Sequence, residues 1–104
     1  MEDGDLTLND VTLTSNSSSY GGGGLRTRYA TLSLTDVIFD QNSANSGPGG
    51  GLFLDGLGSD SDPVLVQNCS FMGNFAASDG SAINSAGQNL TIDGSIFSDN
   101  VTEG

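Results

Sequence analysis

The stretch Thr31-Leu-Ser-Leu-Thr-Asp-Val-Ile-Phe-Asp-Gln-Asn42 carries the pattern that decides the predicted fold. Its repeated apolar positions are 32, 34, 37 and 39, and an asparagine closes it. The pattern occurs once before this stretch and twice after it, so asparagines recur at 16, 42, 74 and 100, separated by 26, 32 and 26 residues. A marker follows three copies, as Gly-Gly-Gly-Leu at 22–25 and 49–52 and Gly-Ser-Ala-Ile at 80–83. Self-similarity at such a period indicates a solenoid.

Short runs of alternating apolar residues predict three short strands in each coil, at 6–8, 11–13 and 25–29 in the first coil. A sandwich of hairpins would need tight two-residue turns, which the repeat lacks. Equivalent strands of successive coils are therefore expected to pair in parallel, and the crossover rule favours a right-handed coil. The sequence predicts an all-β fold, a right-handed parallel β-helix of about four rungs.

A single domain is expected over residues 1–104, with coils at approximately 5–30, 31–62, 63–89 and 90–104. The second coil is longer than its neighbours. Most of its extra residues are expected to form an inserted loop at 55–62.

Equivalent positions of successive coils should stack into interior columns. The predicted core stack consists of Leu13, Phe39, Phe71 and Phe97, with rings spaced by about the strand separation of 4.8 Å. The predicted ladder at the turn consists of Asn16, Asn42, Asn74 and Asn100. An asparagine amide both donates and accepts, so identical side chains can bond along such a stack. Cys69 aligns with Val11 and Val37 and is interpreted as a small buried hydrophobe.

The charge of the chain excludes several kinds of partner. Two Lys and Arg residues against thirteen Asp and Glu give a formal net charge of −11, with no histidine. Such a chain cannot displace the counterions of a nucleic-acid backbone, and it is not attracted to anionic membrane surfaces. No segment approaches the roughly 18 apolar residues of a membrane helix, so neither nucleic-acid binding nor membrane insertion is expected.

Phe39-Asp-Gln-Asn42, Phe71-Met-Gly-Asn74 and Phe97-Ser-Asp-Asn100 match a Phe-x-x-Asn motif, and the glycine-rich markers are similar to a Gly-Gly-Ala-Ile/Leu/Val motif. Together they resemble the repeats of polymorphic outer-membrane proteins and related bacterial surface β-helix proteins. The resemblance extends from Leu6 to Asn100. It implies a secreted or surface-displayed parallel β-helix, extracellular or at the cell surface, often with an adhesive role.

Two groups of carboxylates are candidate sites. Asp55, Asp60 and Asp62 lie in a glycine-containing loop and could supply oxygen ligands to Ca²⁺, although a solvated acidic loop is the simpler interpretation. Asp10 and Asp36 should occupy the same corner of adjacent coils, at a separation that resembles a retaining glycosidase. Aspartate is also an ordinary turn residue, and we expect no catalytic residue, no enzymatic activity and no cofactor apart from this possible calcium.

The predicted function is an extracellular structural or adhesive module. Its open coil ends predict self-association end to end into a filament, or else the chain is a piece of a larger surface protein. A carbohydrate or host-surface ligand is a possible partner. The alternative is a carbohydrate-binding or polysaccharide-cleaving β-helix.

Overall fold

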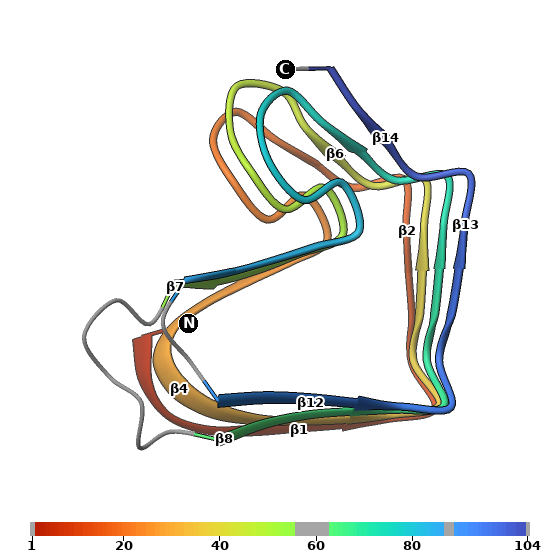
Figure 1. Ribbon diagram of the computed structural model, residues 1–104. Coiled ribbons are helices and arrows are strands. Elements are labelled where there is room, and N and C mark those ends of the chain that lie inside the picture. The colour runs from red at the N-terminus through yellow and green to blue at the C-terminus, as the bar shows by residue number, and fades with distance from the viewer. Residues whose placement is uncertain (1, 56–62, 87–88, 104) are drawn as a thin grey trace.

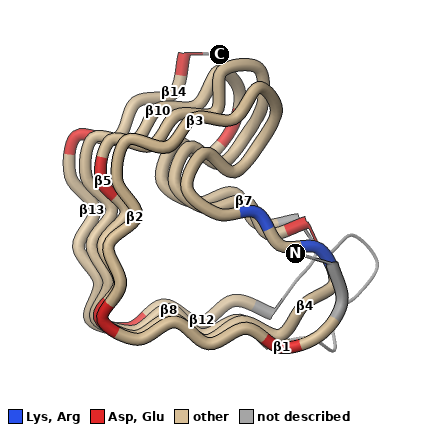
Figure 2. The backbone as a smooth tube through the Cα atoms, turned by 180° about the vertical axis from the view of Figure 1, so that it is seen from behind, with Lys and Arg blue, Asp and Glu red and all other residues tan. Residues whose placement is uncertain are grey.

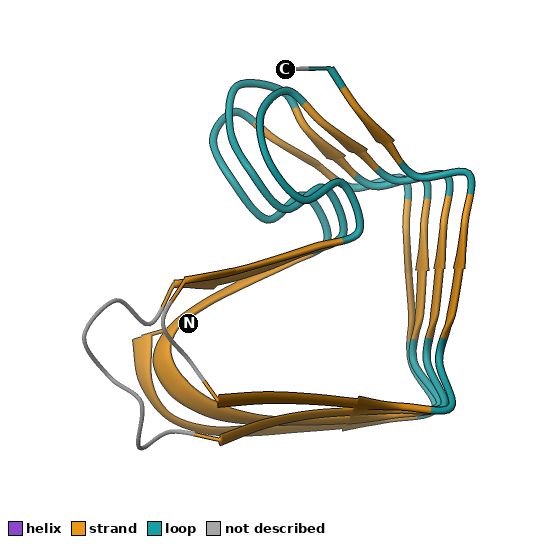
Figure 3. Ribbon diagram, viewed as in Figure 1, coloured by secondary structure: helices purple, strands orange, loops and turns teal. Residues whose placement is uncertain are grey.

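The computed structural model describes residues 2–55, 63–86 and 89–103, and these residues form fourteen β-strands and no helix (Figure 3). The strands are β1 (Glu2–Asn9), β2 (Thr12–Thr14), β3 (Ser17–Ser18), β4 (Leu25–Thr35), β5 (Ile38–Asp40), β6 (Ser43–Ala44), β7 (Leu52–Asp55), β8 (Pro63–Gln67), β9 (Ser70–Met72), β10 (Phe75–Ala76), β11 (Ile83–Ala86), β12 (Asn89–Asp93), β13 (Ile96–Ser98) and β14 (Val101–Thr102).

The strands form three parallel sheets, which the chain visits in turn (Figure 1). The large curved sheet has the order β11-β7-β4-β8-β12, with β1 also paired to β4. The second sheet has the order β13-β9-β5-β2, and the third has the order β14-β10-β6-β3. The chain runs through the three sheets four times, and we call each run a pass. Pass one contains β1 to β3, pass two the second half of β4 with β5 and β6, pass three β8 to β10, and pass four β12 to β14.

The register between passes places like residues side by side. Leu6, Leu32, Val64 and Leu90 are paired in sequence, as are Leu8, Leu34, Val66 and Ile92. In the second sheet the paired residues are Leu13, Phe39, Phe71 and Phe97. The pairing is parallel throughout the described strands, so the hairpin alternative is wrong.

Two strands that were expected to be separate are joined in the structure. The predicted strand at 25–29 and the strand that starts the next coil are one continuous element, β4, of eleven residues. Tyr29 has a φ of 55°, and a single left-handed residue turns the strand without a separate loop. The segments after the ladder asparagines, for which no strand was predicted, carry the two-residue strands β3, β6, β10 and β14. Three separate short strands per coil therefore do not describe the chain.

Single left-handed residues also make the corners. The corner after the first strand is made by Asp10, Asp36, Asn68 and Gly94, with φ values of 57°, 55°, 53° and 63°. The next corner, just before each ladder asparagine, uses Ser15, Gln41, Gly73 and Asp99. Aspartate, asparagine and glycine are the residues that adopt this conformation most readily, which explains their recurrence at the corners.

The core lies between the large curved sheet and the second sheet. Leu32, Leu34, Phe39 and Phe71 are essentially inaccessible to solvent, at 0–1% exposure. Cys69 lies among them at 1% exposure, which confirms its interpretation as a small buried residue. Burial raises the pKa of the Cys69 thiol above its ordinary value of 9.0.

The glycine-rich segments fold back against the sheets. Gly22, Gly49 and Gly80 have φ values of 70°, 70° and 62°. A Cβ on Gly23 would lie 2.4 Å from the carbonyl oxygen of Gly50, and a Cβ on Gly50 would lie 2.3 Å from that of Phe75. The recurrent Gly-Gly-Gly sequence therefore reflects both a left-handed turn and close backbone contact with the next pass.

Candidate functional site: the edges of the stacked passes and an arginine–aromatic cluster

The four ladder asparagines form a row of hydrogen bonds that runs in one direction. The Nδ2 of Asn16 donates to the Oδ1 of Asn42 at 3.0 Å. The Nδ2 of Asn42 donates to Asn74 at 3.1 Å, and that of Asn74 donates to Asn100 at 2.9 Å. The ladder is therefore polar, because in each of its three steps the amide of the earlier pass donates to the amide of the following pass.

Backbone groups complete each step of the ladder. The backbone N–H of Asn42 also donates to the Oδ1 of Asn74, at 3.0 Å. The Nδ2 of Asn42 donates to the carbonyl oxygen of Leu13 at 2.8 Å. The same bonds link Asn74 to Asn100 and to Phe39. Asn42 and Asn74 are fully buried, so each amide satisfies backbone groups that water cannot reach.

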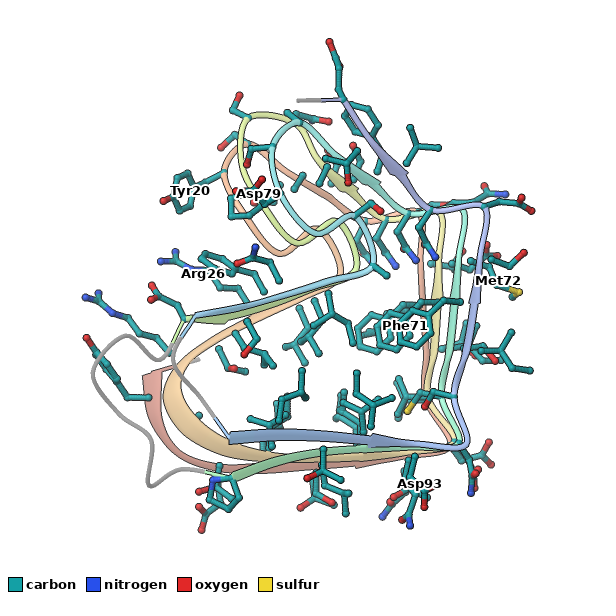
Figure 4. All side chains as sticks on the ribbon, in the orientation of Figure 1. Tyr20, Arg26, Phe71, Met72, Asp79 and Asp93 are labelled. Atoms are coloured by element: carbon teal, nitrogen blue, oxygen red, sulfur yellow. The ribbon has the colours of Figure 1, made fainter. Side chains whose placement is uncertain are left out.

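Phe71 belongs to an aromatic column in the interior of the fold (Figure 4), and the position of Gly51 is close to both Phe71 and Asn74. The rings of Phe39 and Phe71 stack with centroids 4.6 Å apart and an interplanar angle of 3°. Phe71 and Phe97 stack at 5.0 Å and 4°. Nearly parallel rings at this distance are held by burial and by the strand spacing, because the ring separation follows the distance between paired strands.

The edge of pass four exposes the same columns that are buried in the passes before it. Phe97 is 45% exposed and Ile92 is 44% exposed, whereas the paired Phe71 and Val66 are at 0%. At the opposite edge, Leu6, Leu8 and Leu13 are only partly buried. The two edges thus present apolar side chains, unpaired strands and the ends of the amide ladder within the described part of the chain.

A second feature is a cluster of aromatic and charged side chains on the outer surface of the large sheet. The guanidinium of Arg26 lies 5.3 Å from the ring centre of Tyr20 and 5.5 Å from that of Phe53. The two rings contact each other edge to face at 6.3 Å. The Nη2 of Arg26 donates to the Oδ2 of Asp55 at 3.3 Å, and the Nε of Arg28 lies 3.8 Å from the same oxygen. The carboxylate thus holds a guanidinium against two aromatic rings.

This arginine–aromatic cluster gathers both cations of the chain at one place (Figure 2). Tyr20 is 55% exposed, and the sequence did not indicate it as a site residue. The sequence did contain a signal for the charged part of the cluster. Arg28 and Asp55 each lie three residues after the paired residues Leu25 and Leu52, so the repeat register places them opposite each other.

The candidate metal ligands do not form a described site. Asp55 belongs to β7, and its carboxylate pairs with Arg26 and Arg28. Asp60 and Asp62 lie outside the described residues. Among the residues that the structure describes, no group of three or more His, Cys, Asp or Glu side chains is arranged to hold a metal ion.

Asp10 and Asp36 lie at the same corner of adjacent passes, because the residues before them, Asn9 and Thr35, are paired. Both have left-handed backbone, which accounts for aspartate at this corner without any catalytic role. Asn68 and Gly94 continue the column, so the pair of carboxylates is not repeated in later passes.

Comparison of the chain with protein-family models, with curated proteins and with solved structures finds no match. Within the described residues, no helix is long and apolar enough to cross a membrane.

Proposed function

We propose that this chain is a module of a right-handed parallel β-helix that serves a structural or adhesive role outside the cell or at its surface. The observation that carries the proposal is the continuity of the amide ladder through all four passes and of the aromatic column through passes two to four. Interior side chains are used for packing and for satisfying backbone groups. The outer surface is thereby left for contact with partners.

The resemblance to polymorphic outer-membrane repeats supports the extracellular assignment. Its Phe-x-x-Asn motif consists of the residues that the structure places in the stack and the ladder, as in Phe71 and Asn74. The motif therefore encodes a way of stacking passes, and fold alone does not define a ligand. The strongly acidic composition favours solubility and a non-enzymatic surface module.

A polysaccharide panel separates this proposal from a polysaccharide-cleaving β-helix. The purified chain would be incubated with neutral and acidic polysaccharides, and new reducing ends and unsaturated products would be measured. We expect no product above a buffer control. Product formation that disappears in Asp36→Asn, with Asp99→Asn as the control at another corner, would establish a polysaccharide-cleaving enzyme and refute the structural role.

A second candidate function, saccharide binding without cleavage, is favoured by the arginine–aromatic cluster. The exposed ring of Tyr20 offers a flat face for the C–H groups of a sugar, and the fixed guanidinium of Arg26 and carboxylate of Asp55 suit its hydroxyl groups. Titration with a set of neutral oligosaccharides, followed by NMR chemical shifts, tests it. Binding that is lost in Tyr20→Ala but kept in Ile96→Ala, a distant exposed site, would support this function; absence of binding would remove it.

A further inference from the structure

The outer face of the second sheet carries exposed aliphatic side chains between two borders of carboxylates. We infer that this face binds a cationic amphipathic partner, a protein segment whose apolar residues are flanked by lysine or arginine. The inference rests on the described sheet. It goes beyond the structural or adhesive role proposed above, because it names a surface and the chemistry of what covers it.

The apolar part of this face comes from alternate residues of neighbouring strands. Ile38 is 37% exposed and Met72 is 38% exposed, whereas the alternate residues of the same strands are fully buried. Met72 points away from the interior, on the other side of its strand from Phe71 (Figure 4). Ser70 is paired with Ile38 on one side and with Ile96 on the other. We call Ile38, Ser70, Met72 and Ile96 the outer patch.

The exposure of Ile38 and Met72 belongs to the face of the sheet. β5 is paired with β2 and β9, and β9 is paired with β5 and β13, so both side chains have a neighbouring strand on each side. Single exposed aliphatic residues are ordinary on protein surfaces, but adjacent ones with polar surroundings mark contact sites. Methionine in particular adapts its shape to a bound partner. The outer patch is therefore a candidate contact surface.

Carboxylates border the outer patch at both ends of its strands. In pass two, Asp36 lies two residues before Ile38, and Asp40 lies two residues after it. Asp10 occupies the same corner as Asp36 in pass one, and Asp99 lies at the corner after β13. The aliphatic residues thus lie between two borders of negative charge.

These charges decide which partner can cover the outer patch. Both cations of the chain pair with Asp55, across the fold from the second sheet (Figure 2). A second copy of the chain, with its net charge of −11, would add negative charge, as would an anionic lipid surface. A neutral apolar surface would take water from the carboxylates and offer them no hydrogen bond in return. A cationic amphipathic segment suits both parts of the face, since protein interfaces combine an apolar centre with a polar rim.

A synthetic peptide of leucine and lysine in an amphipathic helical pattern tests the inference. One control peptide has glutamate in place of lysine, and a second has serine in place of leucine at the same positive charge. NMR chemical shifts of the full chain locate the contact, and calorimetry measures the dissociation constant. We expect the leucine–lysine peptide to bind at Ile38 and Met72, and more weakly as salt is raised. The two control peptides should bind at least about tenfold more weakly.

A pair of substitutions tests the apolar part of the face. The double variant Ile38→Ser with Met72→Ser should weaken binding of the leucine–lysine peptide about tenfold, because two exposed aliphatic contacts are lost. Leu65→Ser is the control, since Leu65 faces outward from the large sheet. It should leave the dissociation constant unchanged. Circular dichroism would verify that each variant folds.

A second pair tests the border charges. Asp36→Asn with Asp40→Asn removes two of them, and asparagine tolerates the left-handed backbone of Asp36. Asp5→Asn with Asp79→Asn is the control, because it removes two exposed carboxylates elsewhere and leaves the same net charge. The first double variant should weaken binding about tenfold and reduce its dependence on salt, and the control should do neither.

Three results would overturn the inference. The first is no binding of the leucine–lysine peptide to the unmodified chain. The second is equally tight binding of either control peptide. The third is equal binding by the patch, border and control variants, which would show diffuse attraction to an acidic chain. The structural role does not depend on these results, because the polysaccharide panel tests it separately.

Discussion

The phenyl rings of Phe39 and Phe71 lie parallel to within 3°, with their centroids 4.6 Å apart, although they are 32 residues apart in the sequence. Their backbones are paired directly across β5 and β9. The stack is therefore a consequence of register, and it reports whether successive passes are aligned.

Phe71→Ala should destabilise the chain by about 3–5 kcal/mol, as other truncations of buried phenylalanine do. Phe71 is fully buried between two rings, so its removal leaves a hole that neither neighbour can fill without breaking strand pairing. Urea denaturation gives the free energy of unfolding. Phe97→Ala, at the half-exposed end of the column, is the control with a smaller expected loss. A loss below about 1 kcal/mol for Phe71→Ala would contradict an interior column.

Alanine substitutions along the amide ladder should rank in the order Asn42, then Asn100, then Asn16, from most to least destabilising. Asn42 accepts two hydrogen bonds from Asn16 and donates two more in a fully buried site. Asn100 makes three such bonds, but water reaches its edge. Asn16 contributes one side-chain bond, to Asn42.

The expected cost for Asn42→Ala is about 2–4 kcal/mol, since the backbone N–H of Asn16, the backbone carbonyl of Leu13 and the buried amide of Asn74 each lose a partner. Chemical denaturation of the three variants measures the order. Equal losses at all three positions would show that the amides do not act as a directional ladder.

Gly50→Ala should be strongly destabilising, because its Cβ would lie 2.3 Å from the carbonyl oxygen of Phe75 and 2.5 Å from that of Ser81. These are backbone atoms of the next pass and cannot move aside without loss of strand pairing. Gly73→Asn is the control, since this corner glycine has a φ of 63° and asparagine tolerates that conformation. Thermal unfolding should show a large decrease for the first variant and little change for the second. The reverse result would contradict the close contact between passes.

Thr27→Val should leave the stability unchanged or raise it by about 1 kcal/mol. The side chain is fully buried, and its Oγ1 has no hydrogen-bond partner among the described residues. Valine has nearly the same shape and carries no polar atom that needs a partner. Thr35→Val, at a partly exposed position of the same strand, is the comparison. A clear loss of stability in Thr27→Val would indicate a partner for the hydroxyl.

The Cys69 thiol should react slowly with a disulfide reagent in the folded chain and rapidly after unfolding. Burial raises its pKa above 9.0, so the folded state keeps the thiol protonated. The contribution of the buried Cys69 thiol to stability is complete below the pKa of the thiol in the unfolded chain. It is lost as the pH rises through the higher pKa of the thiol in the folded chain. Cys69→Val, which matches the aligned Val37, should remove this alkaline loss. An unchanged pH profile in the variant would exclude the thiol as its cause.

The sequence by itself determined the parallel register. Leucines, phenylalanines and asparagines recur at equivalent positions, and burying one face of a strand specifies its pairing strongly, since a slip of one residue would turn the apolar side chains outward. The pairing of Phe39 with Phe71 and the contact of Asn42 with Asn74 could therefore be predicted from spacing alone.

Only the tertiary structure decided how the chain turns between strands and what its outer side chains do. Nothing in the sequence marks Tyr29 as a left-handed residue. The continuity of β4, which bends at Tyr29, could therefore not be predicted, and two separate strands were expected there. The one-way direction of the amide ladder depends on which atom of each amide faces the next pass, and identical asparagines do not reveal it. Arg26 lies beside Phe53 because the two residues are paired across β4 and β7, but it reaches Tyr20 because the glycine segment folds back over the sheet. Such contacts depend on the path of the backbone in space, whereas periodicity reports only which side chains share a face.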